Sequence, residues 1–210
     1  MIVIVDYEVG NFRNVQKAFE RVGANSVISR DPDVIAGASV LVLPGVGAFG
    51  KAMGNLDSFG IAPLIHRHAL EARKPLLGIC LGMQLLAEEG FEGGRVAGLG
   101  VLPMAVRRLD VADTGLRFPH IGWNDIKPRP ESRLFADIPE KPDFYFVHGY
   151  CVEPAEDSIV AATCDYGGEF VCAVERANVF ATQFHPEKSQ RFGRTVLCNF
   201  LDFCVGYGRA

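Results

Sequence analysis

The chain has 210 residues, of which 49% are hydrophobic and 22% are charged, and its formal net charge is −4. This length and composition are typical of a globular protein with a full core, and they exclude an intrinsically disordered chain. The negative charge argues against nucleic acid or an anionic membrane as the main partner, and no apolar run reaches the roughly 20 residues of a membrane-spanning helix.

Two expectations concern the chain as a whole. It contains no linker rich in Pro, Gly and Ser and no internal repeat, so residues 1–210 are expected to form a single domain. It enters an apolar strand at residue 2, without the basic lead and cleavage site of a signal peptide, so a cytoplasmic protein is expected.

In the first half of the chain, apolar strands alternate with helical patterns. The expected elements are strands at 2–5, near 27–28, at 40–43 and at 75–79, with helices at 12–22 (after Asn11 as N-cap and before Gly23 as stop) and around 61–71. Strands that are apolar on both faces and separated by helices indicate a parallel sheet covered on both sides.

The second half of the chain changes character, because strand signals and turn residues lie close together from 100 to 126 and from 145 to 185. The segments 159–163, 171–174 and 179–184 resemble successive antiparallel strands, and 192–203 has the apolar spacing of a helix. We therefore expect an α/β fold with a mostly parallel central sheet, flanked by helices, and an antiparallel addition.

Cys80 stands where the strand at 75–79 meets a helical pattern that starts at 83–88, with Gly78 and Gly82 two residues to either side. A sharp strand-to-helix turn needs small neighbours, because the chain folds back tightly. Such a turn exposes one side chain at the carboxyl edge of the sheet and directs the first free N–H groups of a helix toward its target. Cys80 is therefore a candidate nucleophile.

The remaining cysteines carry no comparable signal. They show no zinc-site spacing with one another or with histidine, and disulfides are not expected in a reducing compartment. A free thiol in an apolar segment behaves as a small hydrophobe, which is the interpretation of Cys164, Cys172, Cys198 and Cys204. No metal site is predicted.

A cysteine nucleophile needs a base, and five histidines are available. His66 and His68 flank Arg67 on a helix face beside Arg73 and Lys74 and are expected on the surface. His120 and His148 each lie near a strand end and are either structural or line a site. His185 ends an apolar strand, Pro186 stops the ladder, and Glu187 follows two residues later.

This arrangement allows Glu187 to hold one imidazole nitrogen of His185 while the other faces the thiol. The alternative for a lone His-x-Glu is a strand-ending histidine beside a solvated acid. Attack on an amide also creates an oxyanion, for which the N–H of Leu81 and that of Val46 or Gly47 are candidate donors. The glycine-rich loop at 44–47 matches neither phosphate-binding pattern, although a phosphate cradle is the alternative.

Together these residues resemble the class I (triad) glutamine amidotransferases. The resemblance rests on residues 78–84 (Gly-Ile-Cys-Leu-Gly-Met-Gln) and 183–187 (Gln-Phe-His-Pro-Glu). Further motifs at 6–11, 44–49, 119–124, 144–148 and 188–190 resemble the glutaminase subunits of imidazole glycerol phosphate synthases and cover the chain in order. The implied activity is hydrolysis of glutamine to glutamate and ammonia without a cofactor.

The resemblance also implies roles for single residues. Cys80 would be the nucleophile, His185 the general base and acid, and Glu187 the carboxylate that orients it. Gln84 and Glu92 would contact the two ends of glutamine, and the oxyanion would be held by Val46, Gly47 and Leu81. The ammonia would pass to a (β/α)8 cyclase subunit, which Lys188 and Trp123 would face. An exposed acid remains the alternative for Glu92, and plain surface or packing roles remain for Lys188 and Trp123.

Two positions depart from the family pattern, and three other functions remain open. Glu8 stands where the family often has glycine, and Gly149 stands where it commonly has a hydroxyl residue. The alternatives are a glutaminase subunit of another synthase (for anthranilate or aminodeoxychorismate), a free-standing cysteine hydrolase such as a peptidase or γ-glutamyl hydrolase, and a noncatalytic regulatory module.

Overall fold

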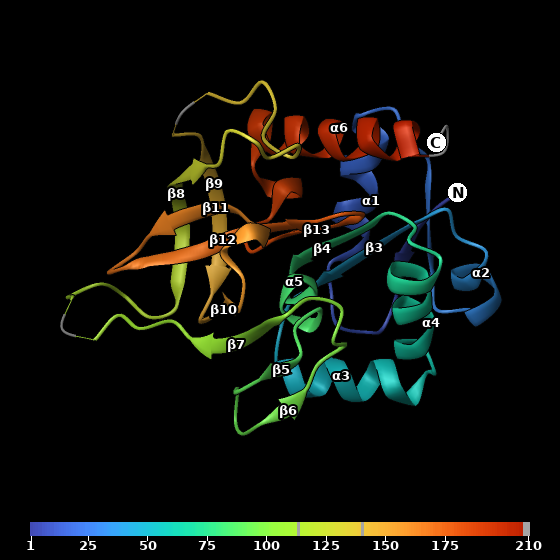
Figure 1. Cartoon of the computed structure of the whole chain (residues 1–210), viewed down its shortest axis with the longest axis horizontal. Helices are drawn as coiled ribbons and strands as arrows, with labels where there is room; N and C mark the ends of the chain where they lie inside the picture. The colour runs from blue at the N-terminus through green and yellow to red at the C-terminus, as the bar shows by residue number, and fades with distance from the viewer. Residues whose placement is uncertain (113, 140, 208–210) are drawn as a thin grey trace.

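The computed structural model describes residues 1–112, 114–139 and 141–207. Its centre is a run of five parallel strands, each hydrogen-bonded to the next (Figure 1). In spatial order they are β2 (Ser26–Ser29), β1 (Ile2–Val5), β3 (Val40–Gly45), β4 (Leu76–Cys80) and β13 (Val179–Thr182). The buried strands β3 and β4 are apolar on both faces, as a sheet covered on both sides requires.

The sheet continues beyond β13 mainly by antiparallel pairing. This part contains β12 (Glu169–Arg176), β10 (Tyr150–Pro154), β7 (Met104–Arg108), β5 (Glu89–Gly90) and β6 (Val96–Ala97). A branch leaves β12 through β11 (Val160–Asp165), β8 (His120–Pro128) and β9 (Asp143–His148). The expected parallel centre with an antiparallel addition is confirmed.

Helices pack on both faces of the parallel strands (Figure 1). They are α1 (Phe12–Arg21), α2 (Pro32–Ala36), α3 (Phe49–Ser58), α4 (Ala62–His66) with the π-helical turn η1 (Arg67–Glu71), α5 (Leu81–Leu85), the 3-10 turns η2 (Asp157–Ile159) and η3 (Pro186–Lys188), and α6 (Gln190–Tyr207). No helix in the described ranges has both the length and the apolar character needed to cross a bilayer.

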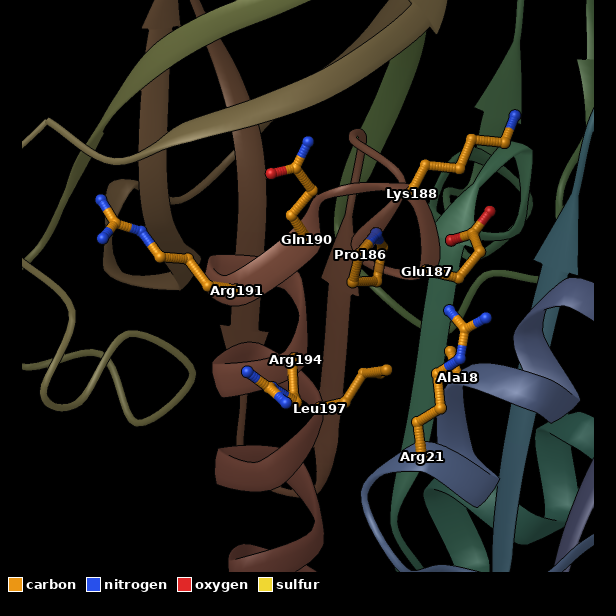
Figure 2. Close-up of a pocket in the computed structure, with 9 residues that line it drawn as sticks. All are labelled: Ala18, Arg21, Pro186, Glu187, Lys188, Gln190, Arg191, Arg194 and Leu197. Carbon is orange, nitrogen blue, oxygen red and sulfur yellow. The ribbon is translucent and has the colours of Figure 1, made fainter.

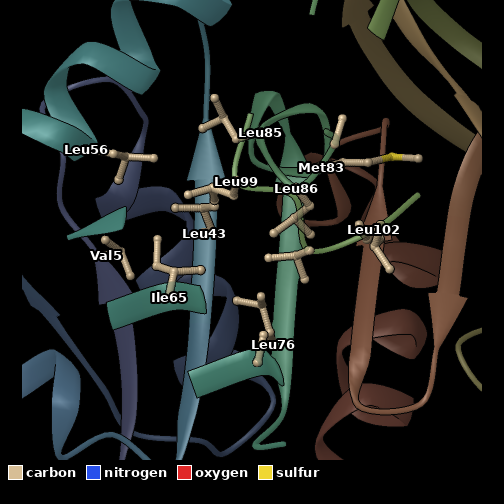
Figure 3. Packing of buried hydrophobic residues seen from close by; sticks show 14 of the residues in the cluster. Val5, Leu43, Leu56, Ile65, Leu76, Met83, Leu85, Leu86, Leu99 and Leu102 are labelled. Carbon is tan, nitrogen blue, oxygen red and sulfur yellow. The ribbon is translucent and has the colours of Figure 1, made fainter. Parts of the chain in front are cut away.

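Alternate residues of β1 face two separate cores. Val3 and Val5 point into the core that α2 to α5 cover, part of which Figure 3 shows, whereas Ile4 points toward α1 and α6. Both cores are fully buried at these positions. The sheet is thus fixed from both sides, and the carboxyl ends of β3, β4 and β13 form a rigid edge.

Most expected elements agree with the structure. The first helix, Phe12–Arg21, has Asn11 as its N-cap, and the Asn11 side chain accepts the N–H of Asn14. The helix after Cys80 spans Leu81–Leu85, whereas the sequence predicted a helix at 83–88. It ends earlier because Glu88, just before β5, already donates its N–H to the carbonyl oxygen of Met104 in β7. Helices α2 and α3 were not predicted.

The expectation that His68 lies on the surface is wrong. His68 is buried, and its Nε2 lies 3.0 Å from the carbonyl oxygen of Pro75. It belongs to the π-helical turn at Arg67–Glu71, in which His68 and Ala69 are the buried residues. Its neighbour His66 is exposed, as expected.

Candidate active site

Cys80 lies on a sharp turn between β4 and α5. Its φ of +54° falls in a region that is strained for a residue with a Cβ and is often held at functional sites. A Cβ on Gly82 would lie 1.6 Å from the backbone oxygen of Leu43, and one on Gly78 would lie 3.0 Å from the Gly82 backbone. The predicted strand-to-helix turn is therefore confirmed, and each glycine has a steric reason.

The sulfur of Cys80 contacts two groups from distant parts of the chain. Sγ lies 3.8 Å from the carbonyl oxygen of Val147, to which the thiol donates. It also lies 3.6 Å from Nε2 of Gln183, which donates to the sulfur. Val147 belongs to β9 and Gln183 follows β13, so the sheet itself holds the surroundings of the sulfur in place.

His185 and Glu187 form a buried pair behind the sulfur. Nδ1 of His185 lies 2.7 Å from Oε1 of Glu187, and their side chains are only 3% and 2% exposed. The carboxylate accepts, so Nδ1 carries the proton and Nε2 is the nitrogen that remains for the thiol. Within the described residues, Nε2 makes no hydrogen bond of normal geometry.

Two forces act on the proton of His185. Burial by itself lowers the pKa of the imidazole, but the interactions with Cys80 and Glu187 outweigh burial and raise this pKa to about 10. Once the sulfur is ionised, the ring therefore holds a second proton, on Nε2, at neutral pH. A proton on Nε2 can be given to a leaving group on a substrate that is bound to the sulfur.

A cavity of about 340 Å³ opens over Cys80. Six residues that the sequence predicted as site residues line it: Val46, Gly47, Cys80, Leu81, Gln84 and Glu92. The lining residues that the sequence did not assign are Phe118, Pro119, Val147, His148, Gly149 and Tyr150. The second set comes from β9, β10 and the segment before β8, which fold over the carboxyl edge of the parallel strands.

Gln84 lies in the lining with its amide nitrogen already engaged. Nε2 donates to the carbonyl oxygen of Tyr150 at 2.9 Å and to Oε1 of Gln183 at 3.0 Å. The carbonyl oxygen of Gln84 is therefore the atom that remains for a ligand, and it is an acceptor that suits an ammonium group.

Glu92 also has a structural contact. Its Oε2 accepts the backbone N–H of Phe49, the first residue of α3, at 2.7 Å. Ala48 offers no side-chain cap, so a carboxylate from a distant segment caps this helix. Glu92 is half-buried, which excludes the alternative of a fully exposed acid.

The candidate oxyanion donors come from two segments that line the same cavity as Cys80. Leu81 opens α5, so its N–H has no partner within the helix. Gly45 pairs in register with Cys80, and a Cβ there would lie 2.1 Å from the hydroxyl of Tyr7. Val46 and Gly47 follow it, and Gly47 has a φ of +123° that strongly favours glycine.

His120 and His148 form a hydrogen-bonded pair, with 3.0 Å between Nδ1 and Nε2. Nδ1 of His148 donates to the carbonyl of Tyr150 at 2.9 Å, so Nε2 of His148 must accept from Nδ1 of His120. Burial lowers the pKa of each ring to about 4, so both are neutral near pH 7. The sequence left each of these histidines as either structural or site-lining. His148 lines the cavity, and His120 does not line it but is hydrogen-bonded to the His148 ring.

Trp123 and Lys188 lie on one outer face, joined through Tyr145. The Trp123 and Tyr145 rings are 6.1 Å apart, and Nζ of Lys188 lies 5.4 Å from the Tyr145 ring. Trp123 is 44% exposed, and Ile121, two residues before it on the same strand, is 59% exposed. Two large apolar side chains are therefore exposed on the same strand, and such a cluster is more typical of an interaction surface than a single exposed apolar residue is.

A second hollow, of about 570 Å³, lies on the outer side of Glu187 and Lys188. Figure 2 shows these two residues on η3, with side chains from α1 and α6 around them. Four cationic residues line the hollow: Arg21, Lys188, Arg191 and Arg194. The outer side of the His185–Glu187 pair is therefore strongly basic.

The two departures from the family pattern each have a local structural account. Glu8 has a φ of +68°, which explains why glycine is usual there, and its carboxylate bonds Arg30 at 2.7 Å. A Cβ on Gly149 would lie 2.8 Å from the ring of Phe118, so Phe118 occupies the space that a larger residue would need.

Comparison with known proteins agrees with this geometry. Residues 3–203 match the glutamine amidotransferase class-I family. The imidazole glycerol phosphate synthase subunit HisH of Moorella thermoacetica is 49% identical over 210 residues, covering 100% of this chain and 98% of the relative. The same subunit of Syntrophotalea carbinolica is 49% identical over 206 residues, covering 96% and 100%.

The fold is also similar to that of solved structures. PurLQS from Thermotoga maritima superposes with a TM-score of 0.73 over 96% of this chain and 97% of that chain, at 22% identity. An identity this low supports the fold alone.

Proposed function

This chain belongs to the class-I glutamine amidotransferase family, among the HisH subunits of imidazole glycerol phosphate synthase, and we propose that it hydrolyses glutamine at Cys80 within that enzyme. The observation that carries the proposal is the cavity over a strained cysteine whose sulfur interacts with the buried His185–Glu187 pair. We propose that residues 1–210 act as one amidotransferase domain.

In the proposed reaction, the proton of the Cys80 thiol passes to Nε2 of His185, and the thiolate attacks the side-chain amide carbon of glutamine. The oxyanion that forms would be held by the N–H of Leu81 and that of Val46 or Gly47. His185 gives a proton to the nitrogen as the C–N bond breaks, which releases ammonia and leaves a γ-glutamyl thioester. Water then attacks the thioester while His185 takes its proton, the C–S bond breaks to release glutamate, and His185 returns the proton to the sulfur.

The remaining lining residues support recognition of the other end of glutamine. The free carbonyl oxygen of Gln84 and the second carboxylate oxygen of Glu92 are acceptors at the same cavity. Both suit the α-ammonium group of an amino acid, and Glu92 adds the opposite charge.

Ammonia loses its nucleophilicity when it is protonated in bulk water, so a separate synthase subunit should receive it directly. We propose a (β/α)8 cyclase subunit that makes imidazole glycerol phosphate and aminoimidazole carboxamide ribotide. The exposed Trp123 and Ile121, with Lys188 and the basic hollow beside them, support a docking face for a partner with an apolar and acidic surface.

We also propose the cytoplasm as the location of this protein. The six cysteines, including the pair nearest the surface at Cys198 and Cys204, are free thiols in the structure. Free thiols are typical of a reducing compartment.

The test uses the chain assembled with the cyclase subunit. We expect the two to elute as one complex, and we expect Cys80→Ala to lower glutamine-dependent product formation by about a thousandfold or more. Ammonium salts should still support the Cys80→Ala complex, because the cyclase remains intact. Cys198→Ala, which changes a cysteine on α6 that does not line the cavity, is the matched control and should keep its glutamine-dependent activity.

Glutamine-dependent synthesis by the Cys80→Ala complex would contradict the proposed nucleophile. Failure of the two subunits to associate would contradict the proposed partner.

A further inference from the structure

Gln183 is a polar residue without a role in the mechanism above, yet its side chain reaches the sulfur of Cys80. It follows β13 directly and is 0% exposed. Its backbone N–H donates to the carbonyl of Cys172 at 2.8 Å, which extends the sheet by one residue. The backbone therefore fixes the side chain in the space between β4 and α5.

The orientation of the Gln183 amide follows from its neighbours. The Tyr150 carbonyl only accepts, so the Gln84 amide must turn its nitrogen toward that oxygen. The same nitrogen of Gln84 lies 3.0 Å from the Gln183 amide, which must present its oxygen there. The nitrogen of Gln183 is then the atom that lies 3.6 Å from Sγ of Cys80.

Besides its interaction with His185, the sulfur thus has one acceptor and one donor beside it. The thiol proton points to the carbonyl of Val147, a contact that is lost when the thiol ionises. Gln183 provides a side-chain N–H that donates to this sulfur in addition to the ring of His185. A hydrogen bond from N–H is stronger to a thiolate than to a thiol, because the acceptor is charged.

We propose that Gln183 stabilises the thiolate of Cys80 through its side-chain N–H, and that Gln84 keeps this amide oriented. The proposal rests on the proposed function, since it takes Cys80 as the nucleophile. Gln84 would then have two tasks, because it also lines the cavity for the substrate.

A purely structural role predicts something different. Loss of a buried hydrogen bond would lower the stability of the fold and leave the proton affinity of the sulfur unchanged. A role as thiolate donor predicts a change in the pH at which the sulfur ionises. The two can be separated without measuring turnover.

The experiment follows alkylation of Cys80 by iodoacetamide against pH in the full chain, with the Cys80 peptide quantified by mass spectrometry. Gln183→Met keeps the volume and removes the N–H, so we expect the midpoint of the profile to rise by about one pH unit. Gln183→Glu, which puts a carboxylate beside the sulfur, should raise the midpoint further.

The rate at high pH should stay at or above the parent value, because a thiolate of higher pKa is the better nucleophile. The matched control is Thr182→Val, one residue earlier, which removes a buried hydrogen bond to the Phe184 carbonyl that does not involve the sulfur. Its midpoint should equal that of the parent.

Two results would overturn the proposal: an unchanged midpoint in Gln183→Met, or an equal shift in Thr182→Val. Neither result would affect the proposed function, which fails only if Cys80→Ala keeps glutamine-dependent synthesis. If Gln183→Met does not fold, Gln183→Leu, which also lacks the N–H and adds no charge, decides the question in its place.

Discussion

Glu92 combines two tasks in one carboxylate, and a single substitution separates them. One oxygen caps α3 at Phe49, and the residue also lines the cavity over Cys80. In Glu92→Gln the amide oxygen still accepts the Phe49 N–H, so the free energy of unfolding should fall by less than about 1 kcal/mol. The charge for an α-ammonium group is lost, so KM for glutamine should rise by about tenfold.

Glu89→Gln is the control for this substitution. Glu89 lies in β5, pairs with Arg95 and does not line the cavity, so its KM should stay at the parent value. Chemical unfolding and steady-state kinetics on the assembled synthase measure both quantities. A Glu92→Gln protein with normal KM and a large loss of stability would show that Glu92 is only a cap.

Part of this residue-scale chemistry was predictable from sequence. His185 and Glu187 are two residues apart, so their pairing is local, and the glycines around Cys80 mark its turn. The contacts of Gln183 and Val147 with the sulfur are not local. These contacts depend on which other strands lie next to β9 and β13, and the spacing of residues along the chain does not predict that arrangement.

At the scale of the elements, the turn at Cys80 depends on how closely α5 approaches β3. A Cβ on Gly82 would lie 1.6 Å from the Leu43 carbonyl oxygen, a backbone atom that cannot rotate away. Gly82→Ala should therefore lower the free energy of unfolding by about 3 kcal/mol or more, or displace the turn and inactivate Cys80. Denaturant titration and alkylation of Cys80 measure these two outcomes.

Gly54→Ala is the matched control, because Gly54 lies inside α3 and a Cβ there would meet nothing within 4 Å. This change should stabilise the protein by about 0.5–1 kcal/mol through helix propensity. Equal stability of the two variants would contradict the close approach of α5 to β3.

Helix α3 also shows where a sequence reading falls short. Gly50 and Gly54 lower its helix propensity, and a distant carboxylate caps its first turn. The signal that would have found it is the buried series Phe49, Ala52, Met53 and Leu56, which has helical spacing. The glycines of the preceding loop and of the helix itself made the segment resemble a loop, so the helical spacing was not recognised.

At the scale of the molecule, the site lies where the sheet changes from parallel to antiparallel. The carboxyl ends of β3, β4 and β13 bring residues 46, 80 and 185 to one edge, which a parallel sheet predicts. The other wall comes from β9, held there by the N–H of His185 on the Tyr145 carbonyl at 3.0 Å. That wall belongs to the branch beyond β12, and the sequence indicated only that antiparallel strands follow.

Three buried histidines distributed over the fold should make its stability depend on pH. Burial lowers the pKa of His68, His120 and His148 to about 4, against about 6.5 in the unfolded chain. Below pH 6.5 the unfolded chain binds protons that the folded chain does not. Their contribution to stability is therefore complete above pH 6.5 and is lost as the pH falls toward 4, with a slope of up to about 1.4 kcal/mol per pH unit for each histidine.

Urea unfolding at closely spaced pH values between 4 and 7 measures this slope. His68→Gln keeps an N–H for the Pro75 carbonyl but cannot titrate, so the slope should fall by about one third. Thr182→Val removes a buried hydrogen bond without removing a proton site, so it should lower the whole curve and leave its slope unchanged. A His68→Gln slope equal to that of the parent would mean that His68 is not held neutral by burial, and the link between its position in the π-helical turn and acid stability would be lost.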